Sequence, residues 1–94
     1  MIIAVDFDGT LQLPDGSPNI ALMNRLKANQ RQGDVVILWT CRTGHKLDEA
    51  LRFLSAYGWR PDLTNQNAPQ IIKQFGHDPR KIYADIYIDD KNAI

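Results

Sequence analysis

Two carboxylates stand two residues apart, directly after an apolar run near the start of the chain. Asp6 and Asp8 follow Ile2–Val5, and Gly9 comes next. A carboxylate at the end of a buried strand is costly unless it is solvated, hydrogen-bonded or matched by a cation. Gly9 permits a turn, or the close approach of a ligand that a side chain would block. The pair therefore suits a nucleophile and a general acid/base, although Asp-x-Asp-Gly alone is also typical of a polar turn.

Two more strand-like runs end in residues that could take part in chemistry. Residues 34–39 read DVVILW and are followed by Thr40, and residues 81–90 read KIYADIYIDD and end in Asp89 and Asp90. Strands joined by right-handed crossovers point the same way, so their carboxyl ends lie at one edge of a sheet. If the last strand returns beside the first, the strand order is 4-1-2-3 and a crevice forms where the order reverses.

This crevice would bring four carboxylates within a few ångströms of one another, namely Asp6, Asp8, Asp89 and Asp90. Converging carboxylates repel unless a hard cation sits among them, and oxygen ligands with few protein donors suit Mg²⁺. We therefore expect Mg²⁺ as a cofactor. The alternative for Asp90 alone is a residue that caps a turn.

The elements that must position these residues alternate between strand and helix. We expect strands at residues 2–5, 34–39, 59–64 and 81–90, with helices ending at Gly33, Gly58 and Gly76 between them. Such alternation predicts an α/β fold in three layers, a Rossmann-like parallel sheet with helices on both faces.

Local signals place the ends of the helices and a small flap. Ser17 is the expected N-cap of the first helix, with Pro18 at its first position. The second helix is expected at residues 46–57, and the third at residues 68–75 with Asn67 as its cap. A turn at residues 14–16 predicts a small hairpin flap before the first helix.

Length and composition indicate one globular domain over residues 1–94. Hydrophobic residues make up 44% of the chain and charged residues 23%, and eleven basic residues balance eleven acidic ones. This balance gives no support for binding to nucleic acid or to an anionic membrane. The single cysteine, Cys41, excludes an internal disulfide and is expected to be a small buried residue. Without a signal peptide or membrane span, a cytoplasmic location is expected.

Four motifs together resemble a known superfamily across the whole chain. They are DFDGT at residues 6–10, the strand ending in Thr40, Lys81, and IDD at residues 88–90. In order and spacing they are similar to the signature motifs of haloacid dehalogenase (HAD)-like phosphohydrolases. AVDFDGT, ILWTCRTG and KIYADIYIDDKN look most like the small capless phosphatases of that superfamily.

The resemblance implies a role for each residue. Asp6 would attack phosphorus and become a transient aspartyl-phosphate, and Asp8 would protonate the leaving oxygen and then activate water. Thr40 would donate its hydroxyl to a phosphoryl oxygen, and Lys81 would offset negative charge. Arg80 or Lys73 could take this role in place of Lys81. In that alternative Lys81 is a solvated surface lysine.

The resemblance also implies a metal site and a phosphate site. Mg²⁺ would be held by the Asp6 carboxylate, the Asp8 backbone carbonyl and Asp89, with Asp90 binding directly or through water. Residues expected to contact the phosphate or substrate are Gly9, Thr40, Cys41, Arg42 and Lys81, with His45 in the same loop.

The sequence has no room for the cap domain that many members of the superfamily carry. We therefore expect an open site, suited to a bulky substrate such as a phosphate on a macromolecule or a nucleotide end, or one covered by a second subunit. The superfamily's sheet usually has a further strand after the fourth motif, whereas Ile94 is only five residues after Asp89. Two alternatives follow: the last strand is an exposed edge, which favours dimerisation, or the sequence is a piece of a longer protein.

Three other functions compete with a Mg²⁺-dependent phosphomonoesterase. A phosphoacceptor signalling module would need its acceptor Asp after a middle strand, where this chain has Thr40. A catalytically idle binding or assembly subunit is another reading, which the intact Asp6 and Asp8 oppose. A phosphatase acting on nucleotides or nucleic-acid ends is the third. The neutral net charge gives no support for nucleic acid as its substrate.

Overall fold

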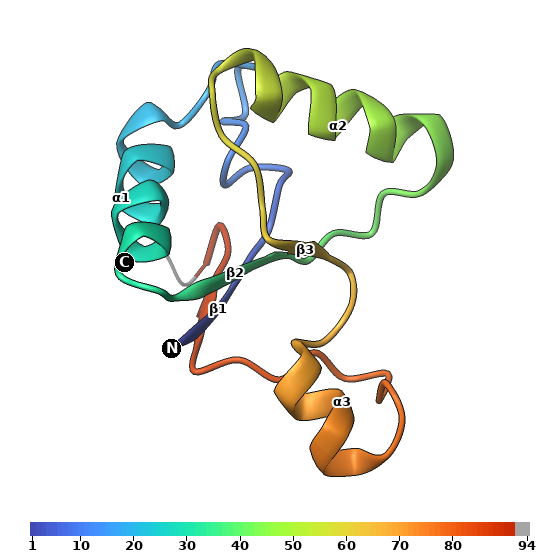
Figure 1. Ribbon diagram of the computed structural model, residues 1–94. Helices are drawn as coiled ribbons and strands as arrows, with labels where there is room; N and C mark the ends of the chain where they lie inside the picture. The colour runs from blue at the N-terminus through green and yellow to red at the C-terminus, as the bar shows by residue number, and fades with distance from the viewer. Residues whose placement is uncertain (92–94) are drawn as a thin grey trace.

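Strands and helices alternate along the chain, as the sequence predicts. The structure is a computed structural model, and it describes residues 1–91. The elements are β1 (Ile2–Val5), α1 (Ile20–Arg31), β2 (Val35–Leu38), α2 (Gly44–Ala56), β3 (Leu63–Thr64), α3 (Pro69–Phe75) and β4 (Ile86–Ile88), drawn in Figure 1. None of these helices has the length and apolar character that a membrane crossing needs.

The strands form one sheet in which each neighbouring pair is parallel. The order is β3-β2-β1-β4, which is β4-β1-β2-β3 when it is read from the other edge, as the crossover argument expects. Ala4 in the centre of β1 lies opposite Ile37 of β2 and Tyr87 of β4. Because all strands point the same way, the residues that follow β1, β2 and β4 meet at one edge of the sheet.

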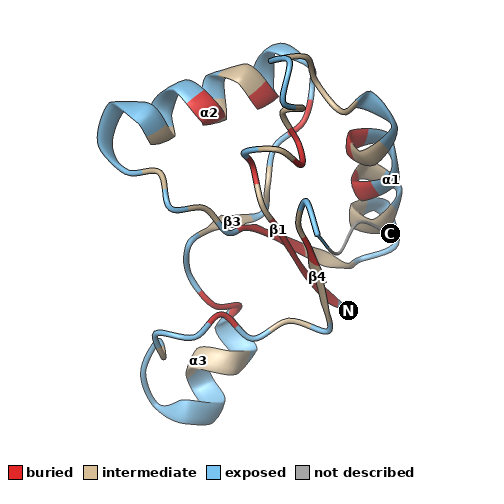
Figure 2. Ribbon diagram, turned by 180° about the vertical axis from the view of Figure 1, so that it is seen from behind, coloured by how far each residue is buried: buried red, intermediate tan, exposed pale blue. Residues whose placement is uncertain are grey.

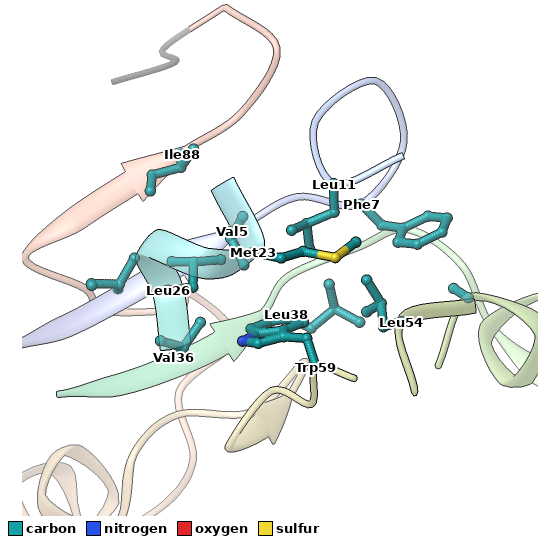
Figure 3. Packing of buried hydrophobic residues seen from close by; sticks show 12 residues of the cluster. Val5, Phe7, Leu11, Met23, Leu26, Val36, Leu38, Leu54, Trp59 and Ile88 are labelled. Atoms are coloured by element: carbon teal, nitrogen blue, oxygen red, sulfur yellow. The ribbon is translucent and has the colours of Figure 1, made fainter. Parts of the chain in front are cut away.

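Helices cover both faces of the sheet, which gives three layers. Met23 and Leu26 of α1 and Leu54 of α2 pack on Val36 and Leu38 at one face (Figure 3). On the other face α3 and the chain before β4 cover a smaller cluster, formed by Ile2, Ala4, Ile37, Ala68 and Ile82. Figure 1 shows α1 and α2 on one side of the sheet and α3 on the other. The second face is therefore covered less completely, since α3 is one short helix.

The first helix begins later than the sequence predicts. Its N-cap is Asn19, whose side chain accepts a hydrogen bond from the Leu22 N–H (3.2 Å), and not Ser17. The predicted hairpin flap explains the difference. The Leu13 N–H donates to the Ser17 carbonyl, and Gln12 forms an antiparallel bridge with Pro18. Ser17 and Pro18 belong to that flap, so the helix starts after them.

Three other predicted boundaries are corrected. β3 is confined to Leu63–Thr64, because Pro61 has no N–H to give to the ladder. β4 is confined to Ile86–Ile88, so Lys81 lies in the preceding loop and not in a strand. Asn67 does not cap α3, whose cap residue Ala68 makes no side-chain bond; the buried Asn67 amide binds the loop before β4 instead.

The described chain contains no inserted domain beside the sheet. Only the flap separates β1 from α1, and only α3 and its flanking loops separate β3 from β4. Figure 2 shows this arrangement: the residues that follow β2 and β4 are exposed or half-buried, whereas the loop after β1 includes the buried Phe7, Thr10 and Leu11.

Candidate active site

Backbone hydrogen bonds bring the ends of three strands together. The Asp6 N–H donates to the Ile88 carbonyl (2.9 Å), and the Trp39 N–H donates to the Val5 carbonyl (2.8 Å). These bonds continue the parallel ladders one residue beyond the strands. The residues that follow the strands then line one hollow of ≈ 250 Å³, formed by Asp6, Trp39, Thr40, Cys41 and Asp89.

Asp6 is half-buried in this hollow. One of its oxygens, Oδ1, accepts a hydrogen bond from the Phe7 N–H (2.8 Å). Burial raises the pKa of Asp6 above its usual value, and the charges of Asp8, Asp90 and Asp89 add to the rise, while the Phe7 hydrogen bond opposes it. The other three carboxylates are therefore close enough to act on Asp6, and a cation beside Asp6 would relieve this repulsion.

The Asp8 side chain turns away from this hollow towards Arg42. The Arg42 guanidinium donates from Nε to Oδ2 (3.0 Å) and from Nη2 to Oδ1 (2.8 Å), a bidentate pair. Arg42 also donates to the Lys46 carbonyl (3.0 Å) and lies over the Phe7 ring, 4.8 Å from its centroid. The hydrogen bonds from Arg42 lower the pKa of Asp8, so its carboxyl is charged at neutral pH.

Gly9 and Asp90 lie against each other beside the strand ends. Gly9 has φ = +76°, and a Cβ at this position would meet the Asp90 Cβ at 3.5 Å. Glycine is thus required for the backbone conformation. Gly9, Asp89 and Asp90 line a second hollow together with Thr10 and Arg25 of α1. Within residues 1–91, the buried Thr10 hydroxyl oxygen has no hydrogen-bond partner.

Thr40 is held in place by the Asn65 side chain, which the sequence did not single out, and by the backbone of Arg42. Its N–H donates to the Asn65 side-chain oxygen (2.8 Å), and its hydroxyl oxygen accepts from the Arg42 N–H (3.2 Å). The hydroxyl proton therefore remains available for donation to a ligand. Cys41 is exposed, and the expectation of a buried residue is wrong because Cys41 already lies in the loop beyond the sheet.

Two of the candidate basic residues, Arg80 and Lys81, share a hollow with a strand-end carboxylate. Arg80 and Lys81 line a third hollow of ≈ 420 Å³ that also contains Asp89, Trp39 and Tyr87. The Lys81 ammonium lies 5.8 Å from the centre of the Tyr83 ring. Lys73, by contrast, lies in the last turn of α3, and it and His45 in α2 are exposed.

Three contributors to the site were missed from the sequence, namely Trp39, Asn65 and Asn67. The available signal for Trp39 was the alternation along residues 34–39, which puts it on the face opposite Leu38. Asn65 and Asn67 carry only the general preference of asparagine for turns, which does not identify a partner.

Among the described residues, the four carboxylates that the sequence predicts around one cation are not grouped closely enough to hold it by their side chains alone. In the part of the chain that the structure describes, no three Asp, Glu, His or Cys side chains are grouped to hold a metal ion. Mg²⁺ usually keeps several waters and takes one or two carboxylates. Asp6 and Asp89, which share a hollow, could supply these, with the Asp8 backbone carbonyl as a further oxygen.

The fold and the strand-end site define a small α/β protein with an all-parallel sheet, compatible with a Rossmann-like fold. No family model and no curated protein matches the chain. A solved structure of a conserved protein coded by a locus from Bacteroides thetaiotaomicron is similar to it, with a TM-score of 0.78 and 38% sequence identity. The similarity covers 98% of this chain and 77% of that protein. The chain belongs to the same family as that conserved protein.

Proposed function

We propose that this protein is a Mg²⁺-dependent phosphohydrolase of the capless HAD-like type, acting on phosphomonoesters through an aspartyl-phosphate on Asp6. The observation that carries the proposal is the shared hollow of Asp6, Thr40 and Asp89 at the ends of three adjacent parallel strands. These are the residues at which the motif resemblance expects nucleophile, phosphate donor and metal ligand.

In the first half-reaction a carboxylate oxygen of Asp6 forms a bond to phosphorus. The bond between phosphorus and the leaving oxygen breaks, and Asp8 gives that oxygen a proton. In the second half-reaction water attacks phosphorus, Asp8 takes its proton, and the bond between phosphorus and Asp6 breaks. The Phe7 N–H on Asp6 Oδ1 orients the carboxylate, so that Oδ2 is the oxygen placed to attack.

Thr40 and a cation stabilise the phosphoryl oxygens. The Thr40 hydroxyl oxygen accepts from the Arg42 N–H, and its proton can be donated to a phosphoryl oxygen. Lys81, or Arg80 beside it, offsets charge from the side of Asp89. Mg²⁺ would be held by Asp6, Asp89 and the Asp8 backbone carbonyl, with Asp90 nearby, and when bound it supplies positive charge for the phosphoryl group.

Arg42 has to leave Asp8 before Asp8 can act as an acid. A carboxylic acid donates a proton only from its neutral form, and the bidentate pair with Arg42 favours the charged form. A phosphoryl group is an equally good bidentate partner for a guanidinium. We infer that the substrate phosphate draws Arg42 from Asp8, which lets the pKa of Asp8 rise as the substrate binds.

The same pair favours a second candidate, a catalytically idle binding subunit. If Arg42 stays on Asp8 when a phosphorylated ligand is present, the acid is never formed and the site only binds. Both candidates bind a phosphorylated ligand, but only the enzyme forms an aspartyl-phosphate on Asp6, and beryllofluoride mimics that intermediate.

The test is hydrolysis of 4-nitrophenyl phosphate with and without Mg²⁺. We expect Mg²⁺-dependent turnover that Asp6→Asn abolishes, because the amide keeps the shape and removes the nucleophile. Asp48→Asn, an exposed residue of α2, is the matched control and should retain full activity. Absence of turnover with beryllofluoride binding intact would point to an enzyme of narrow specificity. Absence of both would leave the idle subunit.

A further inference from the structure

An exposed tryptophan stands beside the proposed reaction centre. Trp39 is the first residue after β2, so alternation places its side chain on the face opposite Leu38, where it lines a hollow with Ile82 and Tyr87. It is 45% exposed, whereas the other tryptophan, Trp59, is buried. The bond from the Trp39 N–H to the Val5 carbonyl fixes its backbone to the end of β1.

A neighbouring tyrosine holds the Trp39 ring in position. The rings of Trp39 and Tyr87 meet edge to face, with 5.5 Å between their centroids and an angle of 62° between their planes. Tyr87 lies in β4 and is itself anchored, since its hydroxyl donates to the Ile82 carbonyl and accepts from the Ala84 N–H. Trp39 is therefore an ordered aromatic surface and not a loosely attached side chain.

Trp39 connects two of the hollows at the strand ends. Trp39 and Asp89 line both the hollow of Asp6 and Thr40 (≈ 250 Å³) and the hollow of Arg80, Lys81 and Tyr87 (≈ 420 Å³). Sites for small molecules commonly measure about 300–1,000 Å³ and combine apolar and aromatic walls with a few polar groups. A molecule larger than phosphate can thus extend from the reactive end along Trp39 towards the two basic side chains.

We propose that Trp39 binds a planar aromatic ring in the leaving group of the substrate, which makes it a specificity residue. The inference rests on the proposed function, since it places the phosphoester at Asp6. A ring in this position stacks on an aromatic surface that is already ordered, so little conformational entropy is lost. Arg80 and Lys81, which line the second of these hollows, favour a ring that carries hydrogen-bond acceptor atoms. A nucleoside monophosphate has this chemistry: a phosphoester, a short spacer and a planar base.

The test compares adenosine 5′-monophosphate with ribose 5-phosphate, which share the same primary ester and differ in the base. For the wild-type protein with Mg²⁺, kcat/KM should be higher for the nucleotide. Trp39→Leu should lower the nucleotide value about tenfold, in line with base stacking on an aromatic side chain, and change the ribose phosphate value less than about twofold. Trp39→Phe should restore part of the loss. Tyr57→Leu is the matched control, because Tyr57 is an aromatic residue with the same 45% exposure, and it should change neither value.

Binding supplies a readout that does not depend on turnover. Adenosine 5′-monophosphate should quench the fluorescence of Asp6→Asn protein, and the quench should disappear when Trp39→Leu is added, with the buried Trp59 as internal reference. If neither substrate is hydrolysed but the quench is seen, the proposed function fails and the aromatic subsite stands. Equal effects of Trp39→Leu on both substrates, or no base-dependent quench, would overturn the subsite. The subsite would also be overturned if Trp39→Leu changed the sedimentation of the protein but caused no base-dependent change in kcat/KM or fluorescence. That result would assign Trp39 to contact with a second copy of the chain.

Discussion

The Asn67 amide should be one of the most costly side chains to remove from this protein. Asn67 is fully buried, and its Nδ2 lies within hydrogen-bond distance of the Asp78 carboxylate (2.9 Å) and the Pro79 and Lys81 carbonyls (both 3.0 Å). Its Oδ1 accepts from the Tyr83 N–H (2.7 Å). One side chain thus fastens the whole loop that carries Arg80 and Lys81.

The cost of Asn67→Ala follows from these contacts. An amide has two hydrogens for three acceptors, so one hydrogen is shared, and about three net hydrogen bonds are lost. Each contributes about 0.5–1.5 kcal/mol, and the Tyr83 N–H is left without its acceptor. We expect the free energy of unfolding to fall by about 3 kcal/mol. For a domain of this size, the midpoint of thermal unfolding should fall by roughly 12 °C or more.

Urea titration followed by circular dichroism measures the loss. Asn24→Ala, on the exposed side of α1, is the matched control and should cost nothing, because alanine is the better helix former. Asn67→Asp keeps the shape but loses both donors and sets a carboxylate beside that of Asp78, so it should cost at least as much as Asn67→Ala. A loss for Asn67→Ala within about 0.5 kcal/mol of the Asn24→Ala value would refute the role of this amide.

Three further predictions concern the site and the core. Asp6→Asn should be more stable than wild type at pH 7 without divalent metal, because burial and neighbouring carboxylates raise the pKa of Asp6. The pKa of Asp6 is higher in the folded than in the unfolded protein, so the gain in stability of Asp6→Asn over wild type should grow as the pH rises from about 4 through the folded pKa. Thermal unfolding that shows a less stable variant at pH 7 would contradict this. Arg42→Gln should raise the pKa of Asp8, measured by carboxyl carbon NMR, and Arg52→Gln should leave it unchanged. Because Asp8 is 58% exposed, the pair should stabilise the fold by less than about 1 kcal/mol above pH 4, and this contribution should be lost as the pH falls through the lowered pKa of Asp8. Leu54→Ala should lower the free energy of unfolding in urea by about 2–5 kcal/mol, since Leu54 is fully buried between α2 and the sheet. Leu51→Ala, at a partly buried position of the same helix, should lower it clearly less. Equal losses for the two variants would mean that the core is packed differently.

The position of the candidate site could be predicted from the sequence. A parallel sheet forces the ends of neighbouring strands to one edge, so three runs that each end in Asp or Thr predict one shared site. The hollow lined by Asp6, Thr40 and Asp89 agrees with that prediction. The roles of these residues stay predictions until turnover is measured.

Element boundaries were less predictable, because two local signals competed for the same residues. Ser17 and Pro18 are good helix-start residues, yet the flap uses them, and Asn19 caps α1. Lys81 was expected in the last strand, but the pairing of β4 with β1 extends only from Ile86 to Ile88. At the start of α1, the hydrogen bonds of the flap outweighed a capping preference worth about 1 kcal/mol.

The sequence by itself determined the alternation of strands and helices, the central place of β1 and the edge at which the carboxylates gather. The strands and helices follow from the spacing of apolar residues, which can be read from short stretches of sequence. The order of the strands follows from the right-handed crossover, which nearly all parallel sheets share. Only the tertiary structure decided that Arg42 binds Asp8, 34 residues away, and that Asn67 holds the loop of Lys81. Such pairs form only when the fold brings two distant side chains to within about 3 Å, the length of a hydrogen bond. No local sequence pattern therefore predicts these partners.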